Sequence, residues 1–225
     1  MDFLQKYLLL NLSKYVVEFL DLLCHPKKFL ALKNGNPDEE LDRALIFMGL
    51  SFAIGVALNG ALTTQITWTE FLFVRPVWFL LYIVILAAAL RFSWLCVGAC
   101  APFLGFLVTF LYYMGVLTVM VCAVLAPLEA IFKHFDPTGY GKFIDLIHFR
   151  SAQHRDALSS PWLAAPISGI LLVNIMELAW TVAVWGAYRK LTDASRLRSF
   201  LAFVIFSFLE RIVTVIFVFF FLILF

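Results

Sequence analysis

Long apolar segments recur along the chain, and short polar stretches separate them. A helix needs ~20 mostly apolar residues to cross the hydrocarbon core of a bilayer. Five segments meet that requirement: residues 44–63, 74–92, 101–125, 161–188 and 200–225. The pattern therefore predicts an all-α, polytopic integral membrane helix bundle with about five transmembrane helices.

The third of these segments leaves the number of spans open. It lies in a stretch, 92–132, in which Glu129 is the only charged residue. Pro102 precedes the expected helix, and Pro127 is expected to end it because proline cannot donate a backbone hydrogen bond. A tight hairpin inside this stretch would make six spans. We favour five because no Asn, Asp or Gly-Pro turn occurs near its middle.

The lysines and arginines between the segments predict the orientation. With the N-terminus in the cytoplasm, that side holds six before the first span, one after the second and four between the last two, against five on the other side. Cytoplasmic loops carry an excess of basic residues. The totals are the same for six spans, so charge predicts a cytoplasmic N-terminus without choosing the span count.

Residues 1–40 precede this transmembrane domain, which we place at 41–225. Residues 1–23 predict a helix with one polar stripe, formed by Asn11, Lys14, Glu18 and Asp21. Leu8, Leu12, Tyr15, Phe19 and Leu22 form the opposite, apolar face. Such an amphipathic helix lies in the membrane interface or packs on the protein's own bundle; the sequence supports both equally.

A basic turn follows this helix. Lys27, Lys28 and Lys33 gather near the expected membrane surface, and the Asn34–Pro37 cluster predicts a turn before the next helix. Basic side chains at this level favour anionic lipid headgroups.

The order of these elements resembles the bacterial branch of the Yip1-domain proteins. The resemblance rests on an amphipathic lead, the short element His25–Leu30, a polar turn and about five spans, with a helix-loop-helix pattern near 180–198. It implies an all-helical membrane domain with a cytosolic N-terminus. Eukaryotic members are membrane-traffic factors that bind small GTPases, whereas bacterial members have no general assigned activity.

Polar residues inside the last two spans form a candidate intramembrane cluster: Asn174, Glu177, Glu210 and Arg211. Ionisable residues at bilayer depth are costly and face a partner or a cavity. Counted from the short loop between the two spans, Glu177 and Arg211 are level at ~16 Å, given ~1.5 Å per residue. We therefore expect a Glu177–Arg211 ion pair, which either clamps the two helices together or belongs to a polar path.

Small residues at four-residue spacing mark the first span. Gly49, Ala53 and Ala57 form one series, and Ser51 with Gly55 forms a second. Small residues let helix backbones approach closely. We expect the first series to pack against another helix of the same chain, or to form a homo-oligomer interface.

Composition narrows the class further. Apolar residues make up 63% and charged residues 14% of the 225-residue chain, against ~45–50% and ~25% in soluble domains. The net charge of +2 suggests no nucleic-acid partner. The four cysteines form no CxxC pair, and the spacings of His and Asp in 133–160 match no metal motif. We expect no catalytic residues, metal or other cofactor, and a second interfacial helix at 143–149.

These observations order three hypotheses about function. The first is a non-enzymatic membrane scaffold or accessory subunit, whose partners are the lipid bilayer and another protein or a second copy. The alternative is a small transporter, or a transporter subunit, with a polar path at Glu177, Glu210 and Arg211. A lipid-modifying enzyme comes third, because only residues 133–160 offer clustered His and Asp.

Overall fold

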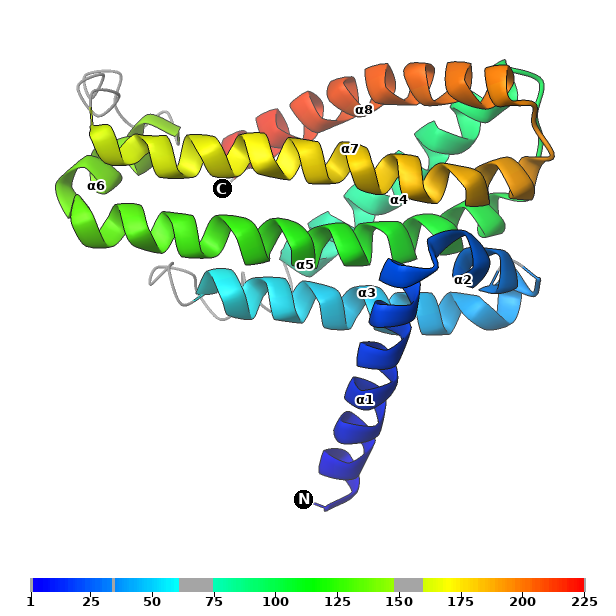
Figure 1. Ribbon diagram of the computed structural model, residues 1–225, viewed down its shortest axis with the longest axis horizontal. Coiled ribbons are helices and arrows are strands. Elements are labelled where there is room, and N and C mark those ends of the chain that lie inside the picture. The colour runs from blue at the N-terminus through cyan, green and yellow to red at the C-terminus, as the bar shows by residue number, and fades with distance from the viewer. Residues whose placement is uncertain (1, 34, 61–74, 148–159, 225) are drawn as a thin grey trace.

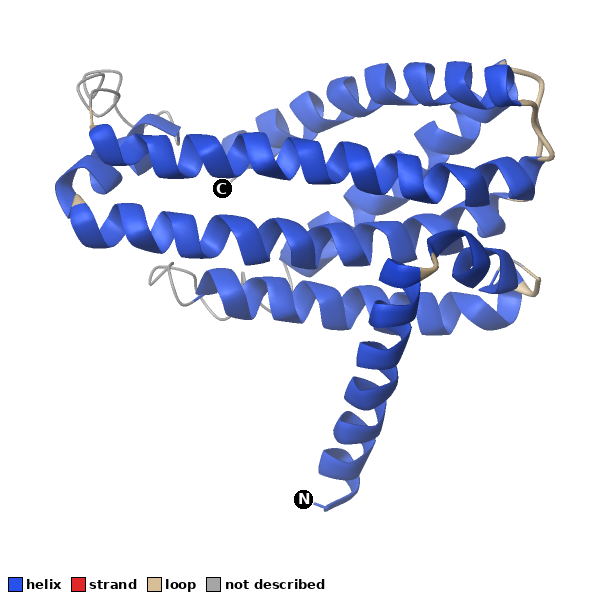
Figure 2. Cartoon of the chain, in the orientation of Figure 1, coloured by secondary structure: helices blue, strands red, loops and turns tan. Residues whose placement is uncertain are grey.

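The computed structural model describes residues 2–33, 35–60, 75–147 and 160–224, and these residues form helices without any strand (Figures 1 and 2). In chain order the elements are α1 (Asp2–Cys24), α2 (Pro26–Lys33), α3 (Pro37–Gly60), α4 (Arg75–Cys96), α5 (Phe103–Phe135), α6 (Pro137–Ile147), η3 (Pro161–Leu163), α7 (Ala164–Thr192) and α8 (Arg196–Leu224).

Five of these helices are long and apolar enough to cross a membrane: α3, α4, α5, α7 and α8. The predicted all-α polytopic fold is therefore confirmed. Successive spans alternate in direction (Figure 1). Helix α5 lies at the centre, where it packs against α3, α4 and α7, whereas α8 packs mainly against α4.

The third span differs most from its predicted bounds. We expected the third span to stop at Pro127, but α5 continues as one helix to Phe135. Pro127 is exposed, so the break in its backbone hydrogen bonding faces away from the bundle. Ala126 and Phe132 on either side of it are buried and hold the helix in place. The hairpin that would have made six spans does not form, because 103–135 is one unbroken helix.

Helix α6 begins earlier than the predicted 143–149. Asp136 starts it: its Oδ1 accepts a hydrogen bond from the Gly139 amide at 2.8 Å, and its Oδ2 accepts one from the Ser160 hydroxyl at 2.6 Å. These two bonds, the Ser160 bond foremost, hold the pKa of the Asp136 carboxyl below its ordinary value. Pro137 follows at the first helical position, where its fixed φ suits a helix start. Residues 148 and 149 lie outside the described part of the chain.

Helix α1 packs on the bundle through part of its predicted apolar face, whereas Leu12 of that face is exposed and the interfacial role stays a prediction. Tyr15 and Leu22, from the predicted apolar face, are buried against the bundle. A second apolar stripe, Leu12, Val16, Leu20 and Leu23, is exposed. Helix α1 lies steeply across the long helices, in front of α3 (Figure 1). One apolar stripe thus packs on the protein and the other is free to enter a membrane interface.

The segment predicted as a basic turn contains the short helix α2, which packs against α7. The aliphatic stem of Lys27 lies across Gly186 of α7, where a Cβ would come within 2.5 Å of the lysine Cε. Phe29 and Leu30 of α2 are buried. Residues 26–33 therefore belong to the helical bundle.

Helices α3 and α5 make the most extensive contact between two described helices. A Cβ at Gly115 would lie 2.6 Å from the Phe47 ring and 3.0 Å from the Ser51 hydroxyl, and one at Gly55 would meet Cys122 and Thr118 at 3.1 Å. The second small-residue series, Ser51 and Gly55, thus makes the close approach to α5.

The first small-residue series faces the other way. Gly49, Ala53 and Ala57 are all exposed, and a Cβ at Gly49 would meet nothing within 4 Å. The expectation that this series packs within the chain was therefore wrong. Both series have the spacing that permits close packing, and only the position of α5 decides which one is used.

The glycine contact can be tested with a matched pair of variants. We expect Gly115→Ala to lower the free energy of unfolding by about 1–3 kcal/mol, because the added methyl overpacks the Phe47 ring. Gly49→Ala should cost nothing, because open space surrounds that position. Thermal unfolding in one detergent measures both. Equal stability of the two variants would contradict the close α3–α5 contact.

Candidate functional site: an intramembrane polar cluster

Helices α7 and α8 carry the charged residues expected at bilayer depth. A short turn joins the helices, and Asp193 ends α7 in the left-handed conformation with φ 49°. Near this turn the two helices contact each other through Trp185, Tyr188 and Phe203, with ring centroids 5.9–6.1 Å apart. Glu177 and Arg211 are equally far in sequence from the ends of α7 and α8 at this turn, and their match in level stays a prediction.

The predicted Glu177–Arg211 ion pair is absent from the ion pairs of the described residues. Beyond the turn, α8 packs on α4 and not on α7. The stripe of α8 that faces the bundle contains Phe206 and Glu210, and Arg211 lies ~100° further round the helix. Arg211 is consequently exposed. Counting residues from the turn predicts how far along its helix Arg211 lies, but it does not predict in which direction around the helix the side chain points.

Two hydroxyl pairs connect these helices to their neighbours. The Tyr82 hydroxyl of α4 lies 2.9 Å from Thr214 Oγ1 of α8. The Tyr113 hydroxyl of α5 lies 2.9 Å from Thr181 Oγ1 of α7. The Tyr113 carbonyl also accepts a hydrogen bond from Trp180 Nε1 at 3.2 Å.

The carboxylates of α7 and α8 lie close to these hydroxyls. Glu210 interacts electrostatically with Glu177 and Arg211, and the same three charged groups act on Tyr82. Four helices thus contribute to one group, which we call the intramembrane polar cluster: Tyr82, Tyr113, Glu177, Thr181, Glu210, Arg211 and Thr214.

Asn174 stands apart from this cluster. Its amide nitrogen donates a hydrogen bond to the Ile170 carbonyl of the preceding turn at 2.7 Å, and its side chain is exposed. Asn174 is level with Thr214 by sequence count, but Thr214 bonds Tyr82 instead. Of the four residues predicted to gather, Glu177 and Glu210 lie towards the bundle while Asn174 and Arg211 face outward.

The tyrosines and threonines of the cluster were missed by sequence reasoning. The sequence does contain a pattern that indicates the threonines. Each of the last two spans carries a glutamate with a threonine one turn later: Glu177 with Thr181 and Glu210 with Thr214. Residues at i and i+4 share one helix face. The repeated pair therefore marks one polar face on each helix, although it does not show which tyrosine each face meets.

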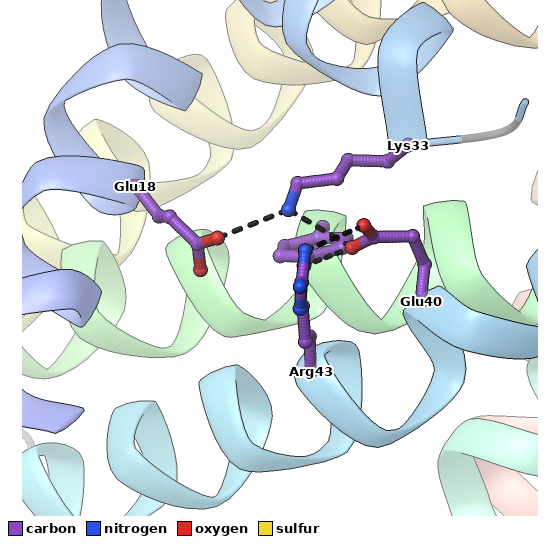
Figure 3. Close-up of polar contacts among 5 residues, drawn as sticks. Glu18, Lys33, Glu40 and Arg43 are labelled. Carbon is purple, nitrogen blue, oxygen red and sulfur yellow. Dashed lines mark hydrogen bonds and ion pairs between the residues drawn. The ribbon is translucent and has the colours of Figure 1, made fainter. Parts of the chain in front are cut away.

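A second polar group lies at the end of the bundle that holds α2. Lys33 Nζ is 3.0 Å from Glu18 Oε1 and 2.9 Å from Glu40 Oε2, so it bridges α1 and α3 (Figure 3). Arg43 Nη1 is 3.0 Å from the other oxygen of Glu40, and the Tyr112 hydroxyl donates to Glu40 at 3.4 Å. We call these residues the Lys33 network.

The three lysines predicted at the membrane surface therefore differ in their exposure. Lys27 and Lys28 are exposed, although the stem of Lys27 covers Gly186. Only 14% of the Lys33 side chain is exposed, and its ammonium lies 5.3 Å from the centroid of the Phe29 ring. Lys33 thus holds helices together and is not available to lipid headgroups.

The metal and thiol candidates were compared with the described part of the chain. No group of three or more His, Cys, Asp or Glu residues in it could hold a metal ion, and none of its four cysteines forms a disulfide. In the segment 133–160, His148, His154 and Asp156 lie outside the described residues, as does the side chain of Asp145.

No protein-family model, curated protein or solved structure matches this chain.

The Lys33 network predicts unequal effects for two lysines of one helix. We expect Lys33→Gln to lower the free energy of unfolding by about 2–3 kcal/mol, because it leaves Glu18 partly buried without its counter-charge and removes one of the two cations that pair with Glu40. Lys28→Gln, at an exposed site in the same helix, should change it little. Thermal unfolding in one detergent provides the measurement, and equal losses would contradict the network.

Proposed function

We propose that this protein is a non-enzymatic integral membrane scaffold or accessory subunit that binds another membrane protein through the outer face of α7 and α8. The observation that carries the proposal is Arg211. This residue is exposed near the middle of a membrane-spanning helix, and it makes no ion pair with the described residues.

The energetic argument concerns what surrounds Arg211. An arginine at the centre of a membrane helix costs roughly 3 kcal/mol on insertion scales, and intramembrane charges usually meet an acidic or carbonyl partner. The described residues supply only the adjacent Glu210, which lies on another face of the helix. A partner helix that brings an acidic or carbonyl group to Arg211 would remove this cost.

One further outward feature supports association through helices. The exposed amide of Asn174 lies on α7 and can bond across a helix interface, as polar side chains do in membranes.

We place the protein in the bacterial inner membrane with its N-terminus in the cytoplasm. In the structure, α2 and the α7–α8 turn lie at one end of the bundle (Figure 1). Lys27, Lys28, Arg189 and Lys190 belong to that end, in keeping with the excess of basic residues on cytoplasmic sides. A Yip1-like role, which the order of elements suggested, agrees with this orientation.

Removing the Arg211 charge tests the proposal. A photo-crosslinking residue at Val215, which is 67% exposed one turn from Arg211, should form an adduct with a second membrane protein or a second copy in native membranes. We expect Arg211→Leu to abolish that adduct, because the ion-pairing group is lost. The adduct is measured by its mass on a denaturing gel and identified by mass spectrometry.

The matched control is Arg198→Leu, which removes an exposed arginine from the first turn of the same helix. It should leave the adduct intact. An adduct that survives Arg211→Leu unchanged would show that Arg211 only extends towards the headgroups and would contradict the proposal.

The alternative function is a small transporter or transporter subunit. The observation that favours it is the collection of two carboxylates and four hydroxyls from α4, α5, α7 and α8 in the intramembrane polar cluster. Acidic and hydroxyl groups gathered at mid-depth are typical of proton and ion pathways. Glu210 is its central residue, because it lies on the bundle-facing side of α8 and interacts with both other charges.

A flux measurement separates this alternative from the scaffold. A transporter predicts proton entry into proteoliposomes, read by an internal pH dye, that Glu210→Gln reduces at least tenfold. Glu129→Gln, in α5 but outside the cluster, should leave the flux unchanged. Absence of flux, or equal flux in the two variants, would count against transport.

A further inference from the structure

A groove lies where α1 crosses the outer face of α3. Its volume is about 570 Å³, and residues of both helices line it. Lys14 of α1 and Arg43 of α3 are its basic residues, Tyr15 and Phe47 form its buried wall, and Ile46 and Leu50 extend it along α3. It is separate from the intramembrane polar cluster, to which it contributes no residue.

The groove favours an anion. Lys14 is exposed and makes no ion pair with any described residue. The Arg43 side chain is 65% exposed and uses Nη1 for Glu40, which leaves further donors of its guanidinium. Glu18 also lines the groove, but Lys33 neutralises it at 3.0 Å. Lys14, Lys33 and Arg43 together face the carboxylates of Glu18 and Glu40, so this group carries one net positive charge, and Lys14 is the cation without an ion pair among the described residues.

An apolar track continues from these cations along α3. Ile46 is 45% exposed, Leu50 is partly exposed, and Ala53 and Ala57 are exposed further along the same side of the helix. From Arg43 to Ala57 the track runs ~21 Å, at 1.5 Å per residue. The two alanines leave a shallow channel on the surface of a helix that spans the membrane.

We propose that this groove binds an anionic glycerophospholipid. Lys14 and Arg43 bind the phosphate, and one acyl chain lies along Ile46, Leu50, Ala53 and Ala57. Arginine can contact two phosphate oxygens at once, and lysine adds a second positive charge.

The position of α1 explains why the ligand is a lipid. The exposed stripe of Leu12, Val16, Leu20 and Leu23 lies on a different face of α1 from Lys14 and Glu18. When that stripe enters the membrane interface, the polar face stays at headgroup level. Arg43, in the second turn of α3, lies near the same end of the bundle. The groove therefore opens where phosphates and acyl chains meet.

Lipid retention provides the test. The full chain is reconstituted in vesicles of equal parts phosphatidylglycerol and phosphatidylcholine, extracted in mild detergent and analysed by native mass spectrometry. We expect the protein to retain phosphatidylglycerol in preference to phosphatidylcholine. The double variant Lys14→Gln/Arg43→Gln should lose about tenfold of this retention, as loss of charge-assisted hydrogen bonds predicts.

A charge-matched control keeps the result specific. Lys28→Gln/Lys190→Gln removes two exposed cations from α2 and α7 at the same end of the bundle and should retain the lipid. Glu40 keeps its contact with Lys33 at 2.9 Å when Arg43 is replaced, so the first variant should still fold. The single variant Lys14→Gln should also lower phosphatidylglycerol retention, and it leaves the Lys33 network unchanged. An equal loss in the control would overturn the proposal.

The acyl track has its own pair of variants. Ala53→Trp should block the channel and lower retention, whereas Ala88→Trp, at an exposed alanine of α4, should not. Retention unaffected by Ala53→Trp would overturn the placement of the acyl chain. Complete displacement of the lipid by millimolar inorganic phosphate would reveal a site for free phosphate and would overturn the lipid proposal.

Discussion

The close packing of α3 against α5, made where the Phe47 ring lies over Gly115, positions the elements around it. It places Tyr112 of α5 5.0 Å from Phe47 and 5.2 Å from Phe29 of α2, measured between ring centroids. Through these rings α2 is held beside α3, and Lys33 reaches Glu18 and Glu40. A side chain at position 115 would separate the helices that form both the Lys33 network and the groove beside it.

The other side of α5 is organised by hydroxyl groups. Tyr113, the neighbour of Tyr112, bonds Thr181 of α7, while α8 is held to α4 by Tyr82 and Thr214. Hydrogen bonds in a bilayer have no water to replace them, so each pair helps to set the rotation of its helix. That rotation turns Glu177 and Glu210 towards the bundle and Arg211 away from it. The proposed partner surface is thus a consequence of the same contacts that build the polar cluster.

The two proposed binding surfaces lie at different depths and involve different helices. The groove between α1 and α3 is near the end of the bundle that holds α2, and it combines cations with an apolar track. The outer face of α7 and α8 carries its polar groups near mid-membrane. A lipid bound on one side and a protein on the other would occupy separate faces, so each can be removed by substitution without the other. Such separation suits a scaffold that meets both lipid and protein.

Several features of this protein followed from the order of its residues alone. Apolar length determined the five spans, and the polar stripe of Asn11, Lys14, Glu18 and Asp21 determined the amphipathic first helix, because both depend only on local spacing. The equal level of Glu177 and Arg211 is also predicted by counting. The sequence could not determine in which direction around its helix each side chain points. From spacing alone, Gly49 and Gly55 are equally suited to close helix packing. In the same way, Glu210 and Arg211 are equally able to face the interior of the bundle. The tertiary structure decided these cases, since they depend on which neighbouring helix supplies the surface, and α5 and α4 are distant in sequence from the residues they contact.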